Sequence, residues 1–404
     1  MLEARTACSG ATGRNGGHTK HASYRHFIDN CKTEGEAEAA KIARFEYNCM
    51  KGVHSFAREY DIECDSWEGD TVDIIYDEGQ LIKARKAVAK MKRILGEDDP
   101  VAKYHLWDPD ETRRRYHVEG SLGSVSYAAG SLSAYRFVIG VLKSALGRGL
   151  NLQTQTPALR IIRSSKGDSR WTVETHRGAV SASKLVLATN GYTAHLSPPF
   201  QGVIVPLRGH MTAQRPGQSL PQDGLPTTYS FIYDDGYEYM IPRPQGSRFA
   251  GDIMIGGGLT KAIKAGLQEF GTTDDATADP IIQDYLIDCT ESYFGSNWGK
   301  DHPEGRLRQA WTGIMGYSSD GFPFVGRMPG EDGLYVAASF QGSGMVLSLL
   351  CAKALTHMMT KHEQKSLDAW FPKAFRLGPE RLNSKFRGRL HSTAPMDLEL
   401  KSQI

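Results

Sequence analysis

The residues best suited to chemistry lie in a glycine-rich stretch near the start of the chain, residues 8–17. Short polar or charged residues separate its four glycines: Ser9, Thr12, Arg14 and Asn15. Exposed backbone N–H groups and short donors of this kind bind phosphate groups well. Two further glycine-bearing stretches, residues 188–191 and 340–344, each follow an apolar run. We expect all three stretches to surround one phosphate-bearing ligand.

Glu3 precedes the glycine-rich stretch and follows Leu2. In a dinucleotide-binding fold, the acidic residue at the end of the second strand bonds a ribose hydroxyl, and the spacing puts Glu3 in that position. A solvated surface charge is the alternative interpretation of Glu3 on spacing alone. Gly342 and Gly344 likewise suit either a ligand-binding loop or an ordinary tight turn.

Helices and loops must position these stretches. Apolar residues three or four apart predict a long amphipathic helix over residues 33–60, which packs on a sheet. A glycine- and serine-rich loop is expected over residues 120–130. The tail from residue 376 onward shows little apolar periodicity and is expected to be surface or disorder. Further helices are predicted over residues 78–95, 131–146, 279–294 and 345–359.

Alternating apolar and polar residues predict the strands. Residues 62–76 are expected to form a hairpin, residues 151–175 a meander of short strands, and residues 184–189 an apolar strand. One antiparallel sheet is predicted between residues 202 and 258. Its strands, and two later ones, are expected at residues 203–205, 210–213, 229–233, 237–241, 248–252, 306–315 and 334–338.

The composition excludes several classes of partner. The 48 Lys and Arg nearly balance the 46 Asp and Glu, so the formal net charge of +2 favours neither nucleic acid nor an anionic membrane. The six cysteines show no metal-binding or disulfide spacing, so no metal site is predicted. No apolar run reaches the roughly 18 residues of a membrane span, and no secretory signal is present. We therefore expect a two-domain cytoplasmic protein that acts on small molecules.

Seven segments of the chain are more specific for a protein family as an ordered set than any one of them is alone. Together they resemble the D-amino acid oxidase-like family of FAD-dependent oxidoreductases, and more narrowly its gamma-glutamylputrescine oxidase-like branch. The resemblance covers roughly residues 1–375. The segments are residues 2–5, 9–18, 188–192, 311–316, 320–326, 333–338 and 342–344.

The resemblance implies an α/β fold with a Rossmann-like FAD-binding domain and an antiparallel-sheet substrate domain of α+β type. The FAD-binding domain would comprise residues 1–60, 124–200 and 301–375. The substrate domain would comprise residues 61–123 and 201–300, followed by a tail of residues 376–404.

The resemblance also implies which residues bind FAD. Glu3 and Arg5 would hold the adenosine half, and the loop ending at His18 would run under the pyrophosphate and ribityl chain. The helix near Met345 would point its N-terminal N–H groups at the flavin ring. The other implied contacts are Ser9, Ala11, Thr12, Asn15, Gly16, Gly17, Ala158, Leu159, Ala188, Thr189, Gly191, Gly316, Gly342, Ser343 and Gly344.

Four residues of the implied substrate domain are candidates for catalysis. Tyr233 would help to cage an amine, and Arg243 would pair with a carboxylate, although tyrosines on strands also suit plain sheet packing. His210 is an acid–base candidate with a structural role as its alternative. Arg208 would stabilise negative charge beside the flavin during reaction with oxygen, with surface or packing roles as the alternatives.

The implied activity is oxidation of a C–N bond of an amine or amino acid, with oxygen as the acceptor. The sequence differs from the family pattern in one respect. The family has a G-x-G-x-x-G motif after its first strand, and no such motif occurs in this sequence. A flavin-free relative, from an incomplete gene model or an inactive product, is therefore the alternative. A nicotinamide-dependent dehydrogenase is a third interpretation. No cysteine is present at position 314 or 315, so covalent attachment of FAD there is not expected.

Overall fold

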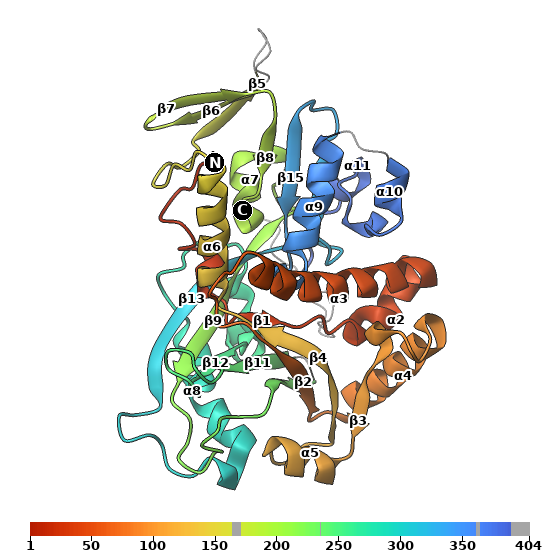
Figure 1. The fold of residues 1–404 in the computed structure, drawn as a ribbon, viewed down its shortest axis with the longest axis vertical. Coiled ribbons are helices and arrows are strands. Elements are labelled where there is room, and N and C mark those ends of the chain that lie inside the picture. The colour runs from red at the N-terminus through yellow and green to blue at the C-terminus, as the bar shows by residue number, and fades with distance from the viewer. Residues whose placement is uncertain (164–170, 235, 361–363, 389–404) are drawn as a thin grey trace.

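The computed structural model describes residues 1–163, 171–234, 236–360 and 364–388. A nine-stranded mixed sheet occupies one half of the molecule, and two three-stranded sheets lie in the other half (Figure 1). None of the described helices is both long enough and apolar enough to cross a membrane.

The nine-stranded sheet is antiparallel except where β10 runs parallel to β2. Its path is β1-β4-β2-β10-β11-β12-β9-β13, with β3 paired to β4 outside that path. The strands are β1 (His18–Thr19), β2 (Trp67–Ile75), β3 (His105–Trp107), β4 (Gly123–Ser131), β9 (Val205–Gln214), β10 (Thr228–Tyr233), β11 (Gly236–Pro242), β12 (Ile253–Gly256) and β13 (Leu307–Tyr317).

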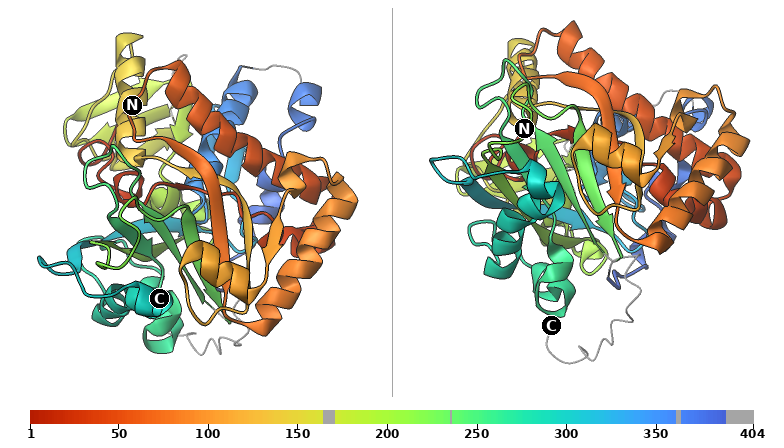
Figure 2. Two further views of the ribbon diagram at one scale, coloured as in Figure 1. Left: turned by 60° about the horizontal axis from the view of Figure 1, so that its bottom comes forward. Right: turned by 90° about the horizontal axis from the view of Figure 1, so that it is seen from below.

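Helices cover both faces of this sheet. Side chains alternate between the two faces along each strand, so each face presents apolar residues that need a covering layer. Phe231 and Ile255 pack with Ile282 and Leu286 of α8 (Pro280–Phe294). On the other face, Ile232 belongs to a core shared with α2 (Tyr24–Thr33), α3 (Glu36–Glu59) and α4 (Glu78–Leu95). Figure 2 shows α8 in teal and the red-to-orange helices on opposite sides of the sheet.

The two small sheets lie at the other end of the molecule (Figure 1). In the first, β15 runs parallel to β8 and antiparallel to β14, and α9 (Ser348–Met359) packs against it. The second is an antiparallel meander. The strands are β14 (Phe324–Arg327), β15 (Leu334–Ala338), β8 (Leu185–Leu187), β5 (Arg160–Arg163), β6 (Trp171–Thr175) and β7 (Gly178–Ala182).

The remaining helices are mostly short. They are α1 (Ala11–Arg14), α5 (Pro109–Tyr116), α6 (Ala134–Gly147), α7 (Thr193–Leu196), α9 (Ser348–Met359), α10 (Gln364–Asp368) and α11 (Pro379–Leu382). Two single turns of 3-10 helix at the glycine-bearing stretches are η2 (Asn190–Tyr192) and η7 (Gly344–Val346).

Several predicted elements are wrong. Residues 67–75 form the single strand β2 instead of a hairpin, and the expected loop at 120–130 is mostly β4. Small residues in β4 let α3 approach: a Cβ at Gly130 would lie 2.6 Å from Nε2 of His54. Residues 248–252 precede β12, and residues 151–155 contribute only a bridge between Gln153 and Leu2.

The expectation for the tail also changes. Residues 376–388 are ordered and include α11, whose Arg381 is largely buried against Asp320 and the ring of Phe324. Residues 389–404 lie outside the described part of the chain. The proposed division into two domains stays a prediction.

Candidate functional site

The second and third glycine-bearing stretches meet at the end of β13. The backbone N–H of Phe340 donates to Oδ1 of Asn190 at 3.0 Å, and the N–H of Gln341 donates to the carbonyl of Gly316 at 3.0 Å. A Cβ at Gly191 would lie 2.6 Å from the carbonyl oxygen of Met315. Glycine is therefore required at position 191 for this close approach of backbones.

The first glycine-rich stretch reaches the same strand. Trp311 donates its indole N–H to the carbonyl of Arg14, and Nη1 of Arg14 donates to the carbonyl of Thr312 at 2.9 Å. A Cβ at Gly313 would lie 3.6 Å from Cα of Ala11. At Gly342, a Cβ would lie 3.1 Å from Sδ of Met315. Residues 311, 313 and 315 share one face of β13, so the loops at residues 8–17 and 340–344 both contact this face.

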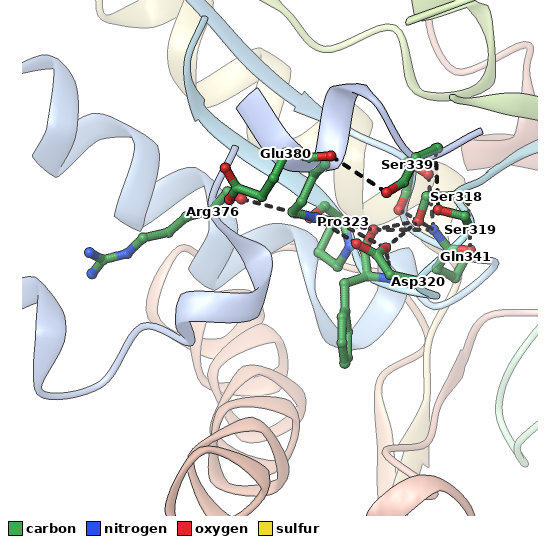
Figure 3. A network of polar contacts seen from close by, with 11 residues as sticks. Ser318, Ser319, Asp320, Pro323, Ser339, Gln341, Arg376 and Glu380 are labelled. Atoms are coloured by element: carbon green, nitrogen blue, oxygen red, sulfur yellow. Dashed lines mark hydrogen bonds and ion pairs between the residues drawn. The ribbon is translucent and has the colours of Figure 1, made fainter. Parts of the chain in front are cut away.

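The loop at residues 339–342 is strained. Ser339 and Gln341 have φ values of 63° and 54°, which L-residues other than glycine rarely adopt. Such conformations persist only where the surroundings fix them. The Gln341 amide donates to Ser318 Oγ at 2.8 Å and to Ser339 Oγ at 2.9 Å, and its oxygen accepts from the N–H of Ser318. Figure 3 shows this network, with Asp320 beside Ser318.

His18 and Met345 close the other end of the site. Strand β1, which contains His18, contacts η7, which contains Met345. Nε2 of His18 lies 2.8 Å from Oγ1 of Thr228. Burial, together with the nearby charge of Lys20, holds the pKa of His18 well below its usual value. His18 is therefore neutral at physiological pH.

The residues predicted for the adenosine half lie beside one another. The backbone of Glu3 bonds Gln153 and Thr156, and Oε1 of Glu3 accepts from the N–H of Arg5 at 2.9 Å. Arg5 is also paired with Asp275 at 2.8 Å. Residues 158 and 159 continue from the segment that Glu3 contacts, and Leu159 is 46% exposed. Ala188 and Thr189 follow β8 and lead into η2.

Arg208 and His210 lie on the face of β9 that packs against α8. They alternate with Gly209 and Met211, which face Met315 and Gly16 on the loop side. Arg208 donates to both oxygens of buried Glu269, at 2.6 and 2.9 Å, and this bond raises its pKa. The structure does not bring these two candidates together with the glycine loops.

His210 has a structural partner on that outer face. Its Nε2 accepts the backbone N–H of Asp279, the N-cap of α8, at 2.9 Å. Burial lowers the pKa of His210. A neutral ring with Nε2 as acceptor is therefore the form that this contact requires.

Tyr233 also faces α8, where its hydroxyl donates to Oε1 of buried Glu238 at 2.6 Å. Tyr293 donates to the other oxygen of Glu238, and Nζ of Lys261 lies 4.3 Å from the centre of the Tyr233 ring. Burial raises the pKa of Tyr233. This cluster accounts for the polar atom of Tyr233 without a substrate.

Arg243 differs from the other three candidates because it lines a pocket. Its Nη2 donates to Asp65 at 2.7 Å, and its Nε donates to the carbonyl of Arg248 at 3.0 Å. The pocket has a volume of about 470 Å³ and is lined by residues 65–67, 223–228 and 242–247.

Sequence reasoning missed a buried ion pair on the loop side of the large sheet. Lys20 donates to Asp73 and, at 2.5 Å, to Oγ of Ser230. Tyr24 and Tyr127 donate to the other oxygen of Asp73 at 2.8 and 3.0 Å. Burial lowers the pKa of Lys20, which the charge of Asp73 partly restores. Asp73 lies between Val72 and Ile74 in an otherwise apolar run, and this position was the sign in the sequence that its charge is buried and paired.

Comparison with known proteins decides the family. The family model described as FAD dependent oxidoreductase (DAO) matches residues 1–358. The chain belongs to this family. Its members depend on FAD, so the predicted cofactor and enzyme class are confirmed.

Individual DAO-family relatives are distant. The chain is 24% identical over 369 residues to a probable oxidoreductase, OrdL, of Rhizobium meliloti, covering 87% of this chain and 75% of that protein. It is 26% identical over 216 residues to glycine oxidase of Pseudomonas aeruginosa, covering 53% and 51%. A crystal structure of glycine oxidase from Geobacillus kaustophilus superposes with a TM-score of 0.70 at 18% identity, over 92% and 90% of the two chains. The predicted fold class is thereby confirmed.

The hydroxyl of Ser9, in the first glycine-rich stretch, fits the FAD of the DAO family. Oγ of Ser9 is buried and has no hydrogen-bond partner within the described ranges. A buried hydroxyl in this state is costly and gains from a ligand that accepts its proton or donates to it. Ser9 lies in the loop whose N–H groups and short donors suit a pyrophosphate.

Proposed function

We propose that this chain oxidises a C–N bond of an amine or amino acid to an imine, and that molecular oxygen is the final electron acceptor. Two electrons and two protons leave the substrate, and their transfer to oxygen gives hydrogen peroxide. FAD supplies the two-electron acceptor when it is bound. The glycine oxidases among the relatives support this reaction class.

The observation that carries the proposal is the convergence of the three glycine-bearing stretches on β13. Residues 8–17 and 342 reach one face of that strand, and Gly191 lies against Gly316 at its end. We assign these residues to the cofactor, with Glu3, Arg5, Ala158, Leu159, Ala188 and Thr189 at the adenosine half and His18, Ser343, Gly344 and Met345 at the ring.

The chain's own groups set the proton balance. Transfer of a hydride from the carbon beside nitrogen requires a neutral amine, so a substrate ammonium must first lose a proton. Neutral His18 lies next to the glycine loop and already shares a hydrogen bond with Thr228. A neutral ring adds no negative charge that would stabilise an ammonium, and the burial that lowers the pKa of His18 also disfavours the charged form of a bound amine, so the ammonium proton is released to solvent.

The experiment is reconstitution of the full chain with FAD, followed by anaerobic addition of a panel of amines and amino acids. We expect a flavin spectrum that bleaches with at least one substrate, and stoichiometric peroxide when air is admitted. A chain that retains no flavin overturns the proposal and favours the flavin-free relative. Stoichiometric NAD binding without flavin favours the nicotinamide-dependent enzyme. Bleaching without peroxide removes oxygen as the acceptor.

A further inference from the structure

An irregular segment, residues 270–279, lies against the first glycine-rich stretch, and we call this segment the strap. It leads from the bridge between Phe270 and Leu207 to the first turn of α8. Residues 271–279, all of them described, form neither helix nor strand. Because such a segment lacks the regular backbone hydrogen bonds of those elements, side chains must hold it in place.

Two residues of β9 hold the strap from the outer face of the large sheet. Nη1 of Arg208 donates to Oγ1 of Thr277 at 2.7 Å. Nε2 of His210 accepts the backbone N–H of Asp279 at 2.9 Å. Strand β13 adds a third contact, since Oγ1 of Thr312 donates to the carbonyl of Thr277 at 3.1 Å. Arg208 and His210 therefore fix the segment that reaches the glycine-rich stretch, although they do not contact that stretch themselves.

Asp275 of the strap binds two arginines of the N-terminal segment. Its carboxylate accepts from Nη1 and Nη2 of Arg5 at 3.0 and 2.8 Å, and its carbonyl accepts from Nη1 of Arg14 at 2.7 Å. The side chain of Asp275 is only 10% exposed. The bond from Arg5 lowers the pKa of Asp275, so the carboxylate is charged at neutral pH. Asp275 thus joins Arg5, before the glycine-rich stretch, to Arg14, within it.

These contacts order a stretch whose backbone is intrinsically free. Glycine loses more conformational freedom on ordering than any other residue, and residues 8–17 contain four glycines. Nε of Arg14 donates to the carbonyl of Ser9 at 2.7 Å, and a Cβ at Gly10 would lie 3.5 Å from Nη2 of Arg5. The two guanidinium groups therefore lie against the turn that contains Ser9. A loop ordered in advance binds its ligand more tightly, because binding then costs less conformational entropy.

We infer that Asp275 is a positioning residue for FAD, and that the strap carries it to the glycine-rich stretch. Asp275 acts through Arg5 and Arg14 and needs no contact with the cofactor. This inference rests on the proposed assignment of residues 8–17 to FAD. It also gives Arg208 a role at a distance from that stretch, because Arg208 fixes the strap.

The test is the rate at which FAD leaves the loaded full chain on dilution, followed by flavin fluorescence. We expect Asp275→Asn to release FAD about 10-fold faster, because a neutral amide cannot accept both charge-assisted bonds from Arg5. Asp275→Glu keeps the charge and should recover part of this loss. Asp284→Asn removes an exposed carboxylate from α8 and should release FAD at the natural rate.

Salt separates positioning by charge from a general loss of structure. The side chain of Arg5 is 43% exposed, so dissolved ions screen its attraction to Asp275. We expect the ratio of the two release rates, Asp275→Asn over the natural chain, to fall towards one as the salt concentration rises from about 0.05 M to about 0.5 M. A merely structural effect of the substitution would leave this ratio unchanged.

Equal release rates for Asp275→Asn and the natural chain at low salt overturn the inference, and so does a ratio that salt does not alter. If Asp275→Asn does not fold, amide hydrogen exchange of the natural chain decides. FAD should then slow exchange in residues 272–279 together with residues 8–17, and unchanged exchange in the strap overturns the inference.

Flavin bleaching by amines, recorded on the same loaded chain, tests the proposed reaction separately. FAD release that depends on Asp275 in a chain that no amine bleaches removes only the proposed reaction. Bleaching by an amine together with equal release rates removes only the inference. A chain that takes up no FAD overturns both.

Discussion

Arg381 donates to both carboxylate oxygens of Asp320, at 2.6 Å from Nε and 3.0 Å from Nη2. Asp320 also accepts from Oγ of Ser318, and Ser318 accepts from the amide of Gln341. The helix α11 is thereby connected to the strained loop at residues 339–342. A residue near the end of the described chain thus supports a loop that we assign to the flavin.

We expect Arg381→Met to destabilise the protein by about 2 kcal/mol, because it removes the counter-ion of Asp320 and the Arg381 hydrogen bonds to three backbone carbonyls. FAD should also dissociate about tenfold more readily. Chemical denaturation and FAD titration measure the two effects. Arg387→Met, at an exposed position of the same segment, is the control. Unchanged FAD affinity in a destabilised Arg381→Met protein would show that α11 does not support the loop.

Gly342→Ala should weaken FAD binding more than Gly344→Ala. Gly342 has a φ of 75°, and its Cβ would lie 3.1 Å from Sδ of Met315 and 3.3 Å from the hydroxyl of Tyr317. At Gly344 the nearest atom would be 3.9 Å away. We expect a cost of about 1–2 kcal/mol at Gly342. Fluorescence titration with FAD compares the two variants, and equal affinities would contradict the strain argument.

Local signals explain which elements could be predicted from the sequence. Helix α4 runs over Glu78–Leu95 as predicted, because Asp77 caps its N-terminus by accepting from the N–H of Gln80 and Gly96 ends it. Strand β4 has no such signal. Its glycines, serines and alanines are typical of a loop, and the contact with α3 and the pairing to β1, β2 and β3 make them a strand.

The site divides in the same way. The glycine-bearing stretches were visible in the sequence because each one carries its own signal. The pairs Lys20–Asp73 and Arg381–Asp320 were not, since each joins residues more than 50 positions apart. Arg208 and His210 were recognised as chemically capable, but the face of β9 to which they point depends on strand register.

Asp73→Asn should destabilise the protein by about 3–5 kcal/mol, because Lys20 then stays buried without its counter-ion. The double variant Lys20→Met with Asp73→Asn should recover part of this loss, since no unpaired charge remains. Urea denaturation at constant pH measures both. Asp70→Asn changes an exposed aspartate of the same strand and should have little effect. A double variant as unstable as Asp73→Asn would contradict the charge explanation.

Glu46 should make stability fall as the pH rises towards neutrality. Burial raises the pKa of Glu46 from 4.5 to about 7, although Ser23 donates a hydrogen bond to its carboxylate. Below pH 4.5 the group is protonated in both the folded and the unfolded chain, so folding gains fully from the neutral form. Between pH 4.5 and 7 only the unfolded chain releases the proton, and stability is lost as the pH passes through the folded pKa.

The shift corresponds to about 3 kcal/mol across that window. Glu46→Gln removes the ionisation, so its stability relative to the natural chain should improve by about this amount between pH 5 and pH 8. Urea denaturation at several pH values gives the difference, and the other titrating groups cancel because both proteins share them. Glu34→Gln, at an exposed position after α2, should run parallel to the natural chain. A constant difference between Glu46→Gln and the natural chain would mean that Glu46 ionises alike in the folded and unfolded states.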